Sequence, residues 1–96
     1  MLRGKCCTNV PEAEVFWVHN GQALRNLVDL AGALESMPAE TFRHHVNKQK
    51  NDFSEWIRNS VKDDRLADAV ARTVTKETIE ILILRRIIGL VAEEPN

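Results

Sequence analysis

The chain has 96 residues, a net charge of −1 at pH 7 with neutral histidines, 44% hydrophobic and 28% charged residues. This length allows one small domain whose single core is buried less completely than that of a larger protein. The composition excludes a disordered chain, and the near-neutral charge argues against a general polyanion binder, so nucleic-acid binding would need a local basic patch.

The cysteines and the apolar stretches predict a soluble, cytoplasmic protein. Cys6 and Cys7 are adjacent, which disfavours a disulfide between them, and no CxxC or Cys/His spacing for zinc is present. We therefore expect free thiols in a reducing compartment. Residues 1–5 lack the apolar run of a secretory signal, and the most apolar stretch, residues 81–84, is too short to cross a membrane.

A β-hairpin is predicted near the N-terminus. Residues 15–19 are β-branched and aromatic and are followed by Asn20 and Gly21, a pair that tolerates the positive φ angles of a type I′ turn. Residues 22–25 would form a brief return strand. A lone ribbon of two strands is marginally stable, so we expect it to lie on helices.

The apolar spacing that follows predicts helices. Asn26 can cap the first helix, with Asp29 completing a capping-box-like arrangement, and Pro38 separates it from a second helix that ends near Val46. Asn51 or Asp52 can cap the third. The third and fourth helices are marked by the apolar series Phe53, Trp56, Ile57, Val61 and Leu66, Ala67, Val70, Val74.

These elements predict a mainly α fold, with about five helices packed as a small bundle and a short N-terminal β-hairpin. Residues 14–96 would form a single helical domain after a flexible lead-in of residues 1–13. Thr75 would cap the fifth helix, which we expect over residues 76–92.

The fifth helix is apolar around most of its circumference. One side carries Ile79, Ile83, Ile87 and Leu90, and a neighbouring side carries Ile81, Leu84, Ile88 and Val91. A domain this small usually buries only one side of a helix. We therefore expect the second side to mediate self-association into a homo-oligomer. The alternative is a central helix that all the other helices surround.

Residues 42–57 form the most distinctive stretch, with two of the three histidines, one of the two tryptophans and two of the three phenylalanines. Strand alternation places Trp17 and His19 together on one face of the hairpin. These considerations predict an interaction surface made of Trp17, Arg43, His44, His45, Asn47, Lys48, Lys50 and Asp52.

Two alternative functions involve the same stretch. A nucleic acid could bind to Arg43, Lys48 and Lys50, although the spacing of Trp56 favours a core position over a base-stacking one. A metal-binding sensor or enzyme could use His44 or His45.

The metal hypothesis lacks a ligand motif. Successive helical residues point about 100° apart, so His44 and His45 do not readily chelate one ion. Glu40 and His44 could supply half a site, completed by His19 or Asp52; the competing interpretation is one packed and one solvated histidine. Asn51 and Asp52 fit a helix cap better than a catalytic pair, and no catalytic or cofactor-binding residue is predicted.

Several segments resemble an uncharacterised family of small bacterial and archaeal domains, a domain of unknown function. The similarity covers roughly residues 14–70 and is carried by Phe16 to Gly21, Leu27 to Leu30, Met37-Pro38, Phe42, His45-Val46-Asn47, Lys50-Asn51-Asp52-Phe53, Trp56-Ile57 and Asp64 to Ala67.

The resemblance implies no activity. It implies that His45, Asn47, Asn51 and Asp52 form either a hydrogen-bonded corner that fixes the angle between two helices or a recognition surface. We therefore expect a non-enzymatic protein-interaction or regulatory module that self-associates through its last helix. The pathway, the partner and the subunit number stay open.

Overall fold

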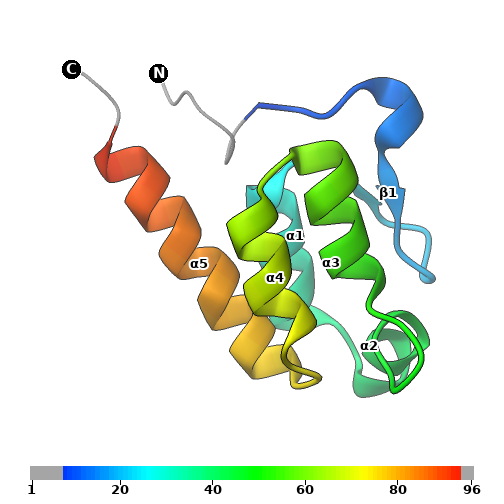
Figure 1. Ribbon diagram of the computed structural model, residues 1–96. Coiled ribbons are helices and arrows are strands. Elements are labelled where there is room, and N and C mark those ends of the chain that lie inside the picture. Colours follow the sequence, from blue (N-terminus) through cyan, green and yellow to red (C-terminus); the bar gives the residue numbers. More distant parts are fainter. Residues whose placement is uncertain (1–7, 94–96) are drawn as a thin grey trace.

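The computed structural model describes residues 8–93, which form five α-helices and a two-stranded antiparallel hairpin (Figure 1). This confirms the predicted mainly α fold. Cys6 and Cys7, predicted as free thiols, lie outside the described residues. The elements are η1 (Glu12–Glu14), β1 (Phe16–Trp17), β2 (Ala23–Leu24), α1 (Leu27–Ser36), α2 (Ala39–His45), α3 (Asp52–Trp56), η2 (Ile57–Val61, a π-helical turn), α4 (Asp64–Ala71) and α5 (Lys76–Ala92).

The hairpin turn differs from the predicted type I′ turn. The Gly21 N–H bonds to the Val18 carbonyl at 2.7 Å, and the Val18 N–H bonds to the Gln22 carbonyl at 2.8 Å, so the loop holds three residues. Gly21 has a φ of 95°, whereas Lys62 is the only non-glycine residue of the described part with positive φ. Asn20 therefore lacks the conformation that a type I′ turn requires, because the longer loop needs positive φ at its glycine alone.

The two faces of the hairpin differ sharply in burial. Val18 is buried, and the Phe16 ring packs at 5.2 Å from Phe53 and 5.9 Å from Trp56, measured between ring centroids. Trp17 points the other way and is 63% exposed. The hairpin therefore covers the aromatic centre of the helical bundle with one face and leaves a large aromatic side chain on the other.

The segment before the hairpin is part of the folded domain. The Val10 N–H donates to the Arg25 carbonyl at 2.8 Å, and the Val10 side chain is buried. The Trp56 indole N–H donates to the Glu14 carbonyl at 2.7 Å. The sequence predicted a flexible lead-in over residues 1–13. A single valine among polar residues gave no sign that Val10 would be buried.

Three helices begin at side chains that accept a backbone N–H from their first turn, and these are Asn26, Asn51 and Asp63. The Asp29 carboxylate accepts the N–H of Arg25 at 2.9 Å, one residue before the N-cap, whereas a capping box uses the N–H of the N-cap residue itself. Thr75 occupies the N-cap position of α5 as predicted, but its side chain makes no capping bond.

Helix α4 is shorter than its apolar series suggested. It ends at Ala71, and Val74 lies in the loop before α5, where it is 65% exposed. The helix ends in a tighter turn, in which the N–H groups of Arg72 and Thr73 bond to the carbonyls three residues earlier. The prediction of Val74 as a buried α4 position is therefore wrong.

Helix α5 packs against α1 and α4 at one edge of the bundle (Figure 1). Its Ile79 and Ile83 side chains are fully buried. The Lys76 ammonium donates to the Leu34 carbonyl at the end of α1, at 2.9 Å. No helix of the described part has the length and apolarity to span a membrane.

Candidate functional site

His45 is the centre of the turn that joins α2 to α3, which we call the α2–α3 corner (residues 43–52). The His45 ring is buried, and its Nε2 accepts the His19 N–H at 2.9 Å. Because Nε2 is an acceptor, the ring proton resides on Nδ1, which donates to Asp52 Oδ2 at 2.9 Å. Lys50 donates to the same carboxylate oxygen at 3.1 Å. Both ring nitrogens are therefore engaged inside the protein.

Asn47 closes the turn itself. Its side-chain oxygen accepts the Gln49 N–H at 3.0 Å, and its amide nitrogen donates to the Arg43 carbonyl at 3.2 Å. The turn also carries an isolated antiparallel bridge between Val46 and Asn51. One amide side chain thus joins the last turn of α2 to the connection that leads into α3.

Asn51 joins the corner to the rest of the bundle. Its oxygen caps α3 through the Ser54 N–H at 3.0 Å, and its amide nitrogen donates to the Val70 carbonyl at 3.1 Å. The Ser54 hydroxyl donates to the Ala67 carbonyl at 2.8 Å. These bonds tie the first turn of α3 to α4. His45, Asn47, Asn51 and Asp52 therefore form the hydrogen-bonded corner that was one of the two expectations for them.

This arrangement does not supply a general base. A histidine oriented by a carboxylate, like His45 beside Asp52, can serve as one when its second nitrogen faces a substrate. Here that nitrogen already accepts the His19 N–H. Among residues 8–93 no buried side-chain nitrogen or oxygen lacks a hydrogen-bond partner. Proton transfer at His45 Nε2 would therefore require the bond to the His19 N–H to open.

His44 lies on the outside of the corner. Its ring stacks on His19 with centroids 3.8 Å apart and an interplanar angle of 21°. Partial desolvation lowers the pKa of His44, the charges of His19, His45 and Lys50 lower it further, and Asp52 raises it. In the described part of the chain, no three His, Cys, Asp or Glu side chains are placed to hold one metal ion. The metal-site hypothesis around His44 or His45 therefore has no third ligand there.

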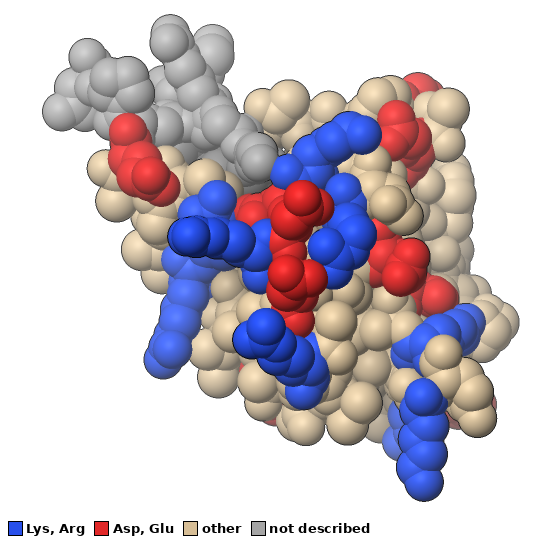
Figure 2. All heavy atoms as spheres, viewed as in Figure 1, with Lys and Arg blue, Asp and Glu red and all other residues tan. Residues whose placement is uncertain are grey.

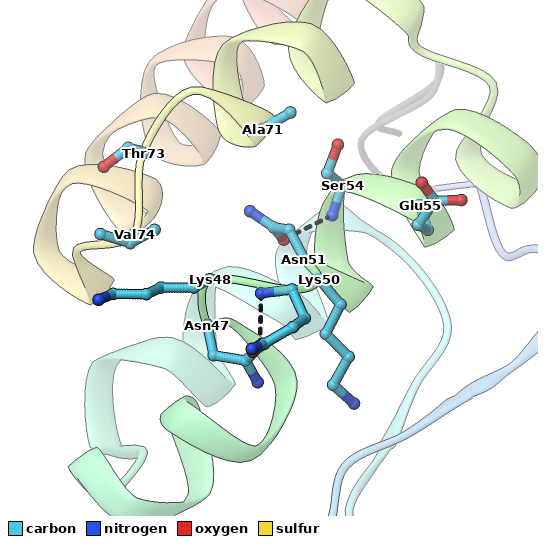
Figure 3. Close-up of a pocket in the computed structure, with 10 residues that line it drawn as sticks. Asn47, Lys48, Lys50, Asn51, Ser54, Glu55, Ala71, Thr73 and Val74 are labelled. Atoms are coloured by element: carbon cyan, nitrogen blue, oxygen red, sulfur yellow. Dashed lines mark hydrogen bonds between the residues drawn. The ribbon is translucent and has the colours of Figure 1, made fainter.

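A shallow pocket of about 390 Å³ lies between the corner and the loop before α5 (Figure 3). Lys48 extends along one side of it toward Val74, whereas Lys50 points away in another direction. Asn51 and Ser54 also line the pocket, but their polar atoms already bond to the backbone. The two lysine side chains do not point to a common position, so the pocket does not form an anion-binding site.

The nucleic-acid hypothesis loses its aromatic partner. Trp56 is buried beneath the hairpin, as its apolar spacing predicted, and is not available to stack on a base. Figure 2 shows acidic and basic side chains interspersed over η2 and α4, where Arg58 of η2 pairs with Asp64 and Asp68 of α4. On this face the basic residues do not form a continuous stripe.

The predicted interaction surface is only partly a surface. Trp17, Arg43, His44, Lys48 and Lys50 are exposed, and Asn47 and Asp52 are half-buried. We expected His45 among them, but its ring is buried between the hairpin and α3 because both of its nitrogens bond to the protein.

The second predicted surface lies on α5. Its outer face consists of Ile81, Leu84, Ile88 and Val91, which are between 38% and 67% exposed. The opposite face holds the fully buried Ile79 and Ile83, with Leu90 partly buried. The alternative of a central helix that all the others surround is therefore wrong, because α5 packs against the bundle on one side only.

A groove of about 270 Å³ runs beside the outer face of α5, between α5 and α1. Its lining combines apolar side chains with two carboxylates and includes Val28, Gly32, Glu35, Glu80, Leu84 and Ile87. Val28 is itself an exposed apolar residue. The apolar surface of α5 thus continues onto α1.

One buried contact escaped the sequence analysis. Asp63 is 3% exposed and accepts from Arg86 Nε at 2.7 Å, which joins the start of α4 to the middle of α5. Sequence patterns cannot pair residues this far apart, but one signal was present. At about 100° per residue Arg86 falls on the same side of the helix as Ile79 and Leu90, where an unpaired charge would be costly.

Comparisons with protein-family models, curated proteins and solved structures found no match to this chain. The resemblance to a family of small bacterial and archaeal domains therefore stays a prediction.

Proposed function

We propose that the protein is a non-enzymatic interaction or regulatory module that self-associates through the outer face of α5. The observation that carries this proposal is the set of exposed apolar side chains Ile81, Leu84, Ile88 and Val91, repeated at helical spacing and continued by Val28 on α1. Contiguous apolar patches on small domains mark interaction sites, since exposing them to water costs free energy that a partner recovers. A cytoplasmic location is part of the proposal.

The non-enzymatic part of the proposal rests on the α2–α3 corner. The ring nitrogens of His45, the Asp52 carboxylate and the side-chain amides of Asn47 and Asn51 all form hydrogen bonds within the protein. The polar residues of the corner thus bond within the protein, whereas Ile81, Leu84, Ile88 and Val91 on the outer face of α5 are exposed in the described part of the chain.

The test is the molar mass in solution, measured by light scattering across a dilution series. The wild-type protein should exceed the mass of one subunit at high concentration and approach it on dilution. The double variant Leu84→Glu, Ile88→Glu should be a folded monomer, because both residues are exposed in the single chain. Circular dichroism would verify that its helicity is retained.

Val74→Glu provides a matched control, because Val74 is equally exposed but lies away from α5's outer face. It should leave the mass unchanged. A wild-type protein that is monomeric at every concentration would refute the proposal. Truncation at Thr75 is unsuitable as a test, since it would remove the buried Ile79 and Ile83 and unfold the domain.

A further inference from the structure

The outer face of α5 has the residue pattern of a parallel two-stranded coiled coil. Ile81, Leu84, Ile88 and Val91 recur at alternating intervals of three and four residues, which makes the isoleucines the a positions and the other two the d positions. At 100° per residue they fall within about 80° of the helix circumference. Among parallel coiled coils, β-branched residues at a with leucine at d favour two strands, and here both a positions are isoleucine and one of the two d positions is Leu84. The residue types thus favour a pair of helices over a larger assembly, and the charges beside them bear on the orientation.

Charges of opposite sign flank the apolar seam that Ile81, Leu84, Ile88 and Val91 form along α5. Glu80 and Arg85 are five residues apart and lie about 140° from each other around the helix, on opposite sides of the apolar residues. Within residues 8–93 the side chain of neither forms a salt bridge or hydrogen bond. Glu35 lines the groove on the same side as Glu80. One flank of the seam is therefore acidic and the other carries a free guanidinium.

The two possible symmetric dimers treat these flanks differently. A two-fold axis parallel to the helices places the Glu80 flank of each chain against the Arg85 flank of the other. A two-fold axis perpendicular to the helices places each flank against its own copy, so that like charges face each other. The parallel arrangement also gives the spacing from g to the following e position that coiled coils use for interhelical salt bridges.

We infer that the outer face of α5 binds a second copy of the chain in parallel orientation, with Glu80 paired to Arg85 of the partner subunit. This inference rests on the proposed self-association and specifies its geometry. Ile79 and Ile83 attach α5 to its own domain from roughly the opposite side of the helix. The two domains therefore lie outside the helix pair, where they do not obstruct it. Because each domain already holds its α5 in helical form, the short seam of residues 81–91 does not need the nucleation that an isolated peptide would need.

Charge exchange tests the pairing. Glu80→Arg and Arg85→Glu, each alone, convert both salt bridges of the homodimer into repulsive pairs and should raise its Kd roughly ten-fold. An equimolar mixture of the two variants should form a heterodimer with an affinity close to wild type, because every pair is then opposite in charge. The double variant Glu80→Arg, Arg85→Glu should also dimerise with a Kd close to that of the wild type. Sedimentation or light scattering with one variant carrying a larger tag would quantify each species.

The control is Glu93→Arg, which makes the same change of charge at the C-cap of α5, outside the seam. It should leave the Kd within about two-fold of wild type, since surface charges away from a contact have little effect. An effect of Glu80→Arg no greater than that of Glu93→Arg, or a mixture that fails to recover, would overturn the inferred pairing.

A disulfide tests the orientation independently. In a background with Cys6 and Cys7 changed to serine, Leu84→Cys should form a disulfide-linked dimer on mild oxidation, because equivalent d positions face each other in a parallel pair. In an antiparallel pair position 84 lies across from position 88, so the cross-link would form only in a mixture of Leu84→Cys and Ile88→Cys chains. That second result would overturn the parallel orientation while leaving self-association intact. A monomeric wild-type protein would instead remove the proposed function itself.

Discussion

The α2–α3 corner and the outer face of α5 use their side chains in opposite ways. At the corner, polar groups of the kinds found in active sites form hydrogen bonds within the protein, and these bonds connect two helices and the hairpin. On α5, side chains that ordinarily build a core are exposed to solvent. Residue type alone therefore misleads about function here. What distinguishes a candidate interaction site is a group that has not found its partner within the chain.

Two isoleucines of α5 should show the largest difference between a buried and an exposed apolar side chain. Ile83→Ala should reduce the free energy of unfolding by about 2–5 kcal/mol, because Ile83 is fully buried and its loss leaves a cavity. Ile88→Ala removes the same atoms from a side chain that is 67% exposed, and should change the stability of the monomer by less than about 0.5 kcal/mol.

Urea denaturation at a protein concentration below the dimer Kd would measure both isoleucine variants, since association stabilises the folded state at higher concentration. Ile88→Ala should show its effect only in the dilution series, as weaker association. A large loss of monomer stability in Ile88→Ala would mean that the outer face is a core surface, contrary to its exposure.

A smaller effect is expected at the corner. Asn51→Ala removes the cap of α3 and one of the two hydrogen bonds that the Val70 carbonyl accepts, which should cost about 1–3 kcal/mol. Asn59→Ala is the matched control, because Asn59 is exposed and its side chain forms no hydrogen bond within the described residues. Thermal unfolding of both variants would measure the difference. Equal stability would show that the corner's bonds contribute nothing net to folding.

The smallest effect concerns pH. Because the pKa of His44 is lowered from 6.5 in the folded protein, the folded state binds fewer protons than the unfolded state just below that pH. This contribution to stability is therefore complete above pH 6.5 and is lost as the pH falls through the folded pKa. An NMR titration of the His44 ring should give a midpoint below 6.5.

Beyond desolvation, which lowers the pKa of His44 most, the same titration can measure the contribution of Lys50. Lys50→Gln should move the His44 midpoint upward, because a cation that lowers the pKa is removed and Asp52, which raises it, loses its ion-pair partner. A midpoint that stays in place would exclude Lys50 as a contributor.

Much of the fold followed from local patterns. Apolar periodicity identified α5 with its observed bounds, and the caps at Asn26 and Asn51 followed from residues whose short polar side chains bond to nearby backbone. Val74 misled because a β-branched residue at helical spacing resembles a core position even after the helix has ended. Local patterns identified these elements and caps, although the equally local turn at Asn20 and Gly21 was predicted with the wrong loop length and Thr75 makes no capping bond.

The candidate site was predictable to a different degree in its two regions. The exposed face of α5 could be foreseen, because a small domain cannot cover a helix that is apolar on two sides. The burial of His45 could not, since its Nε2 bonds to the backbone of His19, 26 residues away. The pair of Asp63 and Arg86 likewise depends on tertiary geometry. Contacts between distant residues decide which polar groups are free, and a single sequence does not encode them visibly.

The uneven attachment of α5 gives the helix a gradient of local stability. Its fully buried residues, Ile79 and Ile83, lie in its first half, whereas in Figure 1 its C-terminal turns lean away from the other helices. Segments with little burial open more often than the domain as a whole. A partner that covers Ile88 and Val91 would therefore suppress fraying as well as gain contact area. Binding would include an entropic cost of ordering, and residues far from the seam that steady these turns would tune affinity without touching the partner.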